Sequence, residues 1–145
     1  MRNQKGFSLI ELLIVVAIIL IIAAIAIPRM LQARIAANES SAVSTIRTIS
    51  SAQITYRIYH TSYAADLTVL GSTGENLLPD TIAETPHQHS GYVFTTSGDD
   101  ARFVAAGAPI TAGQTGVRSF CSNTPAVIRF SPTETGCDPD ASDPL

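Results

Sequence analysis

The hydrophobic pattern of the chain changes sharply after its first 28 residues. These read MRNQKGFSLIELLIVVAIILIIAAIAIP, and every residue from 12 to 27 is Leu, Ile, Val or Ala. As a helix, residues 7–27 would extend about 31 Å, which matches the hydrocarbon thickness of a bilayer. The pattern therefore predicts a transmembrane or otherwise fully enclosed helix over residues 7–28. Glu11 is the one ionisable side chain in that segment.

After Pro28 the pattern becomes amphipathic. Apolar residues recur at helical spacing and form one stripe, while serines and Arg47 occupy the other side. The stripe consists of Ile35, Ala42, Ile46, Ile49, Ala52, Tyr56 and Tyr59. No Gly or Pro interrupts residues 29–70. We therefore predict one continuous helix from about Phe7 to Tyr59, whose second part, residues 29–59, packs its stripe on a head formed by residues 60–145.

The head reads as short strands separated by turns. Residues 91–97 (GYVFTTS) and 101–108 (ARFVAAGA) flank an acidic turn and predict a β-hairpin. Residues 117–122 (VRSFCS) and 126–131 (AVIRFS) predict two further strands. About four antiparallel strands packed against a long helix make this an α+β fold.

The segment between the helix and the hairpin reads differently. Residues 63–72 (YAADLTVLGS) predict a connection with a short helical turn. Residues 74–91 (GENLLPDTIAETPHQHSG) predict a loop, because Pro79, Pro86 and many polar residues disfavour a regular element.

Charge is distributed unevenly over the 145 residues. The formal net charge of −3 is too small and of the wrong sign to indicate nucleic-acid binding. Residues 7–59 carry four Arg against Glu11 and Glu39, a balance of +2. Residues 60–145 carry three Arg against ten acidic residues, a balance of −7. Opposite charges on the two parts could attract neighbouring copies; ordinary solvated surface charge explains the individual residues equally well.

The chain has two cysteines, Cys121 and Cys137. If the head is exported to an oxidising compartment, a disulfide between them is the default interpretation. Two cysteines without a second pair or a nearby His make a poor zinc site.

The apolar segment allows two interpretations. Ala24-Ile25-Ala26 offers a small-x-small cleavage site, which would release a soluble secreted binding protein beginning near Ile27. Alternatively the segment is retained in the membrane. The twelve Ile, Leu or Val residues of 12–27 favour insertion by about 4–7 kcal/mol, more than the roughly 2.5–3.5 kcal/mol that a carboxylate costs at mid-membrane. Arg2 and Lys5 would keep the N-terminus cytoplasmic.

The residues KGFSLIELLIVVAII resemble the N-terminus of type IV pilins and of type II secretion pseudopilins, and the match continues through Pro28. The resemblance implies cleavage by a prepilin peptidase after Gly6, which removes residues 1–6 as a leader. It also implies N-methylation of Phe7, an assembly role for Glu11 and a helix bend at Pro28. The family often has a glycine between those last two positions, and this chain has none. The family also typically has a C-terminal disulfide.

The resemblance offers a reason for the acid in the apolar segment. Cleavage would create a free amine on Phe7, which is largely protonated at neutral pH. A lone carboxylate is strongly penalised in a low-dielectric environment, whereas one with a cationic partner is tolerated. We therefore expect Glu11 to pair with the N-terminal amine of a neighbouring copy, setting the register of assembly. An interfacial acid that faces lipid headgroups is the alternative.

The resemblance implies a structural subunit of a type IV pilus-like filament. Its partners would be further copies of the chain, the prepilin peptidase, the membrane and the inner-membrane assembly machinery, with no nucleic acid evident. It would reside in the bacterial inner membrane before assembly and in an extracellular pilus afterwards. A pseudopilin or minor pilin, which forms no long external fibre, is the closest alternative.

Few residues suggest chemistry. His87 and His89 could supply two metal ligands, and Asp138, Asp140 and Asp143 could supply oxygen ligands, but solvated side chains explain both groups better and we predict no metal. The Gly-x-Ser-x-Gly, phosphate-loop and HExxH motifs are absent from the sequence. We therefore expect neither an enzyme nor a cofactor.

Overall fold

The computed structural model describes residues 6–72, 76–133 and 136–145 and divides into two compact units, Met1–Ala33 and Arg34–Leu145. We call the second the globular unit. The helix α1 (Leu9–Tyr59) begins in the first unit and ends in the second. The remaining elements are α2 (Leu67–Ser72), α3 (Asp80–Ala83), β1 (Gln88–His89), β2 (Tyr92–Gly98), β3 (Phe103–Pro109), β4 (Ser119–Asn123), β5 (Ile128–Ser131) and β6 (Asp143–Pro144).

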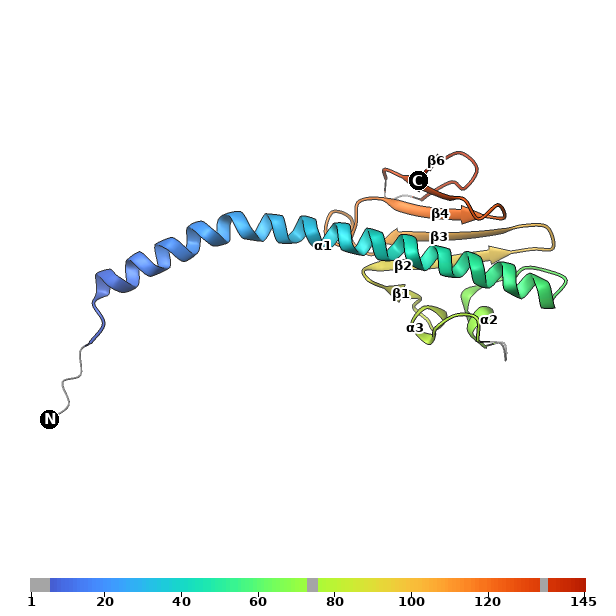
Figure 1. Cartoon of the computed structure of the whole chain (residues 1–145), viewed down its shortest axis with the longest axis horizontal. Coiled ribbons are helices and arrows are strands. Elements are labelled where there is room, and N and C mark those ends of the chain that lie inside the picture. Colours follow the sequence, from blue (N-terminus) through green and yellow to red (C-terminus); the bar gives the residue numbers. More distant parts are fainter. Residues whose placement is uncertain (1–5, 73–75, 134–135) are drawn as a thin grey trace. The chain divides into compact units, whose positions relative to one another are not determined.

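The strands form one antiparallel sheet in the order β1-β2-β3-β4-β5-β6. In the globular unit, α1 lies across the sheet, with β4 and β6 on one side of it and β1, α2 and α3 on the other (Figure 1). The α+β fold with a long N-terminal helix is thus confirmed. The predicted hairpin is also confirmed, since β2 pairs with β3 from Tyr92↔Pro109 to Gly98↔Phe103.

Two sequence predictions about the head were wrong in detail. Within the described residues the sheet has six strands, more than the four predicted. The additional strands, β1 and β6, contain two residues each and are too short for an alternating pattern to reveal them. Residues 74–91 were predicted to form a loop, yet their described part contains α3 and β1. Pro79 precedes the first residue of α3, a position that needs no backbone N–H, so the proline starts the helix there.

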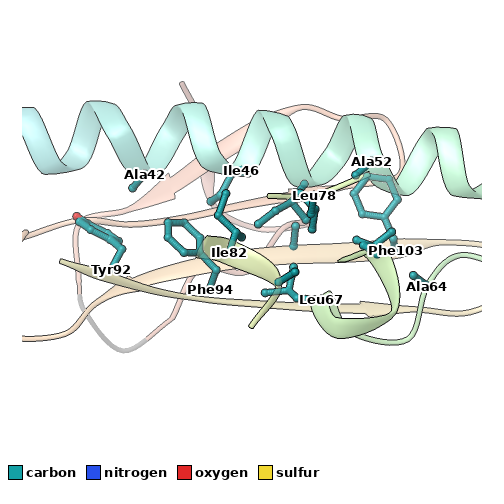
Figure 2. Packing of buried hydrophobic residues seen from close by; sticks show 14 of the residues in the cluster. Ala42, Ile46, Ala52, Ala64, Leu67, Leu78, Ile82, Tyr92, Phe94 and Phe103 are labelled. Atoms are coloured by element: carbon teal, nitrogen blue, oxygen red, sulfur yellow. The ribbon is translucent and has the colours of Figure 1, made fainter. Parts of the chain in front are cut away.

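The core lies between the α1 stripe and one face of the sheet. Figure 2 shows Ala42 and Ile46 of α1 near Tyr92 and Phe94 of β2. The members of this cluster that are less than 2% exposed are Ala42, Ile46, Ile49, Ala64, Leu67, Leu70, Tyr92, Phe94, Phe103, Ala105 and Phe120. Burying each Leu, Ile or Phe side chain of this cluster stabilises the fold by about 1.5–3 kcal/mol relative to leaving it exposed.

The predicted stripe is correct in its middle and wrong at its end. Ala42, Ile46, Ile49 and Ala52 are buried, and Tyr56 is half-buried against the core. Tyr59, however, is 67% exposed. Helical periodicity places a residue on a face but cannot tell where the partner surface ends.

The connection after α1 is fixed by two polar side chains. The buried amide of Gln53 donates to the Ala64 carbonyl and to Thr96 Oγ1, each at 3.0 Å, and accepts from the Ala64 N–H at 2.9 Å. Asp66 Oδ1 accepts from the N–H groups of Thr68 and Val69, which caps the N-terminus of α2. These hydrogen bonds hold the segment that follows α1 against the helix and the sheet.

The disulfide between Cys121 and Cys137 is present. Cys121 is fully buried in β4, and Cys137 belongs to the C-terminal segment. The segment is also held by Arg129, which donates to the Ser142 carbonyl at 2.8 Å, and by Asn123, which donates to Asp140 at 3.0 Å. The bridge therefore attaches an otherwise polar tail to the central strand of the sheet.

Candidate processing and assembly segment

The segment from Gly6 to Glu11 combines an open backbone with the start of α1. Gly6, Phe7 and Ser8 have no regular secondary structure and are exposed. A side-chain carbon built on Gly6 would meet no atom within 4 Å. The first backbone hydrogen bond of α1 runs from the Leu12 N–H to the Ser8 carbonyl at 3.2 Å. The Gly6–Phe7 peptide bond is therefore accessible, and Glu11 lies in the first helical turn, where a negative charge is favourable.

The N-terminal part of α1 exposes apolar side chains all round. Its large hydrophobic residues from Phe7 to Leu31 are between 42% and 80% exposed. Monomeric soluble proteins rarely expose continuous apolar surface on this scale. Within the described residues, α1 is the one helix long and apolar enough to cross a membrane. This surface requires lipid or other apolar helices around it.

One face of this helix carries a shallow apolar groove. It is lined by Leu9, Leu12, Leu13, Val16, Ala17 and Leu20. These residues are three or four positions apart, which is the spacing of the ridges and grooves through which helices pack. This spacing is compatible with packing against another helix.

Pro28 lies inside α1. Proline has no backbone N–H, so the carbonyl of Ala24 loses its usual helical partner. The sequence prediction of a bend at Pro28 remains a prediction.

A polar clamp joins α1 to the sheet in the globular unit. Glu39 Oε1 accepts from the N–H groups of Val117 and Arg118 at 3.0 and 3.1 Å. Its Oε2 accepts from Arg118 Nε at 2.9 Å and Nη2 at 2.7 Å. The Arg118 guanidinium also lies 5.5 Å from the rings of both Phe120 and Phe130. Such bidentate, charge-assisted pairs are among the stronger polar contacts in proteins.

The comparisons with known proteins identify the N-terminal segment. Residues 1–27 match the prokaryotic N-terminal methylation motif. The chain is also 43% identical over 82 residues to the type IV wide pilus major component PilA4 of Thermus thermophilus, an alignment that covers 57% of this chain. Through these two matches the chain is similar to type IV pilins. It spans 63% of the length of that relative.

The residues predicted to serve processing and assembly are close together in the chain. Gly6, Phe7 and Glu11 are within one exposed stretch at the start of α1. Arg2 and Lys5, predicted to orient the N-terminus, lie outside the described residues. The alternative cleavage site, Ala24-Ile25-Ala26, lies inside α1, whereas proteases prefer exposed, irregular backbone.

Sequence reasoning missed the two polar residues, Glu39 and Gln53, that hold α1 against the rest of the globular unit. Glu39 was counted only as a charge, and Gln53 was not singled out. The signal was nevertheless available, because residues 39, 42, 46, 49 and 53 follow the three- and four-residue spacing of the buried stripe. A polar side chain on a buried stripe must find a partner. The sequence does not reveal the identity of that partner, because Arg118 is 79 positions away from Glu39.

Three of the residues considered as metal ligands, His87, Asp138 and Asp140, have other partners. His87 Nδ1 lies 3.0 Å from the Ile82 carbonyl oxygen. Asp138 Oδ1 accepts from the Asp140 N–H at 2.9 Å, and Asp140 lies 3.8 Å from Arg102. Among residues 6–72, 76–133 and 136–145 no group of three or more His, Cys, Asp or Glu side chains is placed to hold a metal.

The clamp makes the stability of the globular unit sensitive to acid. Burial raises the pKa of the Glu39 carboxyl. The hydrogen bonds from the Arg118 side chain and from the Val117 and Arg118 N–H groups lower it by more, so the pKa of Glu39 in the folded protein lies below its ordinary value. The clamp therefore stabilises the fold fully above about pH 4.5, the ordinary pKa of this carboxyl. This stabilisation is lost as the pH falls through the lower pKa that Glu39 has in the folded protein.

We expect Glu39→Gln to destabilise the protein at pH 7 by about 2 kcal/mol and to flatten the pH dependence of its melting temperature below about pH 4.5. Thermal melting of the protein in detergent, followed by circular dichroism, measures both effects. Asp100→Asn, which neutralises an exposed acid at the β2–β3 turn, is the control. A variant at position 39 that melts like the control at every pH would contradict the role of the clamp.

Proposed function

We propose that this pilin is a structural subunit of a type IV pilus-like filament and that it catalyses no reaction itself. The observation that carries the proposal is an apolar helix, exposed on all sides and headed by Glu11, joined to a disulfide-linked globular unit. The similarity to a protein named as a pilus major component supports the same conclusion.

Processing comes first in this scheme. A prepilin peptidase cuts after Gly6, removing residues 1–6, and the new N-terminal residue, Phe7, is N-methylated. The accessible Gly6–Phe7 bond supports this, because it lies outside regular secondary structure. Methylation of an amine retains its positive charge, so the N-terminus remains a cation that Glu11 can bind.

Before assembly the subunit waits in the bacterial inner membrane. Residues 7–28 cross the bilayer, Arg2 and Lys5 keep the N-terminus on the cytoplasmic side, and the globular unit lies outside. The inner-membrane assembly machinery then transfers subunits into the growing extracellular filament. Neighbouring helices replace the lipid around α1, using faces such as the groove lined by Leu12 and Val16.

Glu11 sets the register of this assembly. The carboxylate of one copy pairs with the Phe7 amine of a neighbour, which removes two charges from an otherwise apolar interior. Displacing the helices along their axes would separate the pair. Each copy makes this contact with the next copy along one direction, and the series of copies does not close into a ring. The contact therefore generates a filament.

Electron microscopy of material sheared from cells of the native host tests this proposal. We expect filaments that contain the processed chain, identified by immunogold labelling of the globular unit. A deletion of the gene for the chain serves as the control. Cells that produce the processed protein in their membranes but yield no labelled filaments would instead indicate a pseudopilin or a minor pilin.

A further inference from the structure

The connections at the two ends of strand β3 differ in character. The turn between β2 and β3 is charged and includes Asp99 and Asp100. The connection at the other end begins with residues 110–117, here called the β3–β4 loop, and these residues are all uncharged. In this loop Ile110 is 46% exposed and Val117 is 50% exposed. The sheet therefore has a charged turn at one end and an uncharged, partly apolar loop at the other.

The β3–β4 loop is attached to the part of α1 that enters the globular unit. Asn38 Nδ2 donates to the Thr115 carbonyl at 2.9 Å, and Glu39 accepts from the N–H groups at the end of the loop and just after it. The charged turn lies near the other end of α1, where the Tyr63 N–H donates to the Asp99 carbonyl at 3.0 Å. The uncharged loop is therefore at the end of the globular unit from which α1 continues to its apolar part.

This attachment point is close to the membrane in the proposed arrangement. Asn38 follows Pro28, the last residue of the predicted membrane segment, by ten positions, all within α1. Because a helix rises 1.5 Å per residue, the two residues are about 15 Å apart. The headgroup layer occupies roughly 5–7 Å of this distance. Three extended loop residues can span the remaining distance of about 10 Å. A loop held at Asn38 is therefore within reach of the bilayer surface.

The charge beside the loop favours an anionic surface. Arg34 is exposed and lies one helical turn before Asn38, so the two residues are on the same face of α1. Glu39, the acid that contacts the loop, is 7% exposed and paired with Arg118, so it offers no free carboxylate. Basic residues next to a membrane segment are attracted to anionic lipids.

We propose that before assembly the β3–β4 loop rests on the outer surface of the bilayer, with Ile110 and Val117 in the headgroup layer and Arg34 close to lipid phosphates. The proposal rests on the membrane stage of the proposed function, because it requires residues 7–28 to span the bilayer. The short helical connection and the exposed Arg34 favour a lipid surface as the partner of this loop. The contact restricts tilting of the globular unit while the subunit waits in the membrane.

Tryptophan fluorescence tests the contact, because the chain has no tryptophan of its own. The Ile110→Trp protein is reconstituted in vesicles of phosphatidylethanolamine and phosphatidylglycerol whose acyl chains carry bromine near the headgroup. Because a tryptophan at headgroup level lies beside that bromine, we expect the protein to lose roughly half of its fluorescence relative to unbrominated vesicles. Val117→Trp should behave in the same way. Ala101→Trp, in the exposed β2–β3 turn, is the matched control and should lose little.

The outcomes separate this inference from the function on which it rests. If the wild-type protein does not float with the vesicles in a density gradient, the membrane stage of the proposed function fails. If it floats with them but the two loop variants lose no more fluorescence than Ala101→Trp, the inference fails and the function stands. Equally strong quenching of all three variants would also overturn the inference, because the bilayer would then contact the globular unit without preference for the loop.

Discussion

Replacing Glu11 with alanine should leave the protein in the membrane and reduce the filament yield roughly a hundredfold. Insertion should persist or improve, because the change removes the one charged side chain of residues 7–28. Assembly should fail because the Phe7 amine of the neighbouring copy would be buried without its partner. Breaking a buried ion pair in this way costs about 3–5 kcal/mol.

Glu11→Gln distinguishes this ionic role from a local effect on the helix. Ser8 and Glu11 have the Ser-x-x-Glu spacing of a capping box, and glutamine can replace glutamate in that motif. Glu11→Gln should therefore preserve the start of α1 yet assemble as poorly as Glu11→Ala. The measurements are the amount of membrane-bound pilin and the amount of sheared filament per cell. Near-normal filament yield from Glu11→Gln would show that the negative charge is not needed.

Loss of the disulfide should cause the largest change in the stability of the globular unit. The bridge joins residues 16 positions apart, and on the chain-entropy model a loop of this length stabilises the fold by about 3 kcal/mol. Cys137→Ser should lower the free energy of unfolding by about that amount, measured by urea denaturation of the full-length pilin in detergent.

Cys137 is the better position for this test, because Cys121 is fully buried and a serine there would also bury a hydroxyl. The wild-type protein with a reducing agent is the matched control and should resemble Cys137→Ser without reductant. Reductant should then have no further effect on the variant. Equal stability of the wild type, the reduced wild type and the variant would show that the bridge does not stabilise the unit.

Local patterns in the sequence predict the parts of this fold that depend on neighbours along the chain. The uninterrupted apolar run and the stripe through Ile46 and Ile49 predict α1, and the alternating residues around Asp99 predict the β2–β3 hairpin. The two-residue strands β1 and β6 and the exposure of Tyr59 depend on contacts between distant segments. The pattern of residues within one segment cannot predict contacts with a distant segment.

The candidate site shows the same division. Gly6, Phe7 and Glu11 are adjacent in the sequence, so their grouping follows from the motif itself. The Glu39–Arg118 clamp requires the sheet to bring residues 79 positions apart together.

The mass of the mature N-terminus tests the central claim most directly, because every proposal here depends on retention of the apolar helix. Mass spectrometry of the protein purified from its native host should give a chain that begins with a methylated Phe7. A chain that begins at Ile27 would have lost the helix. It would make this a soluble secreted protein and contradict assembly through α1.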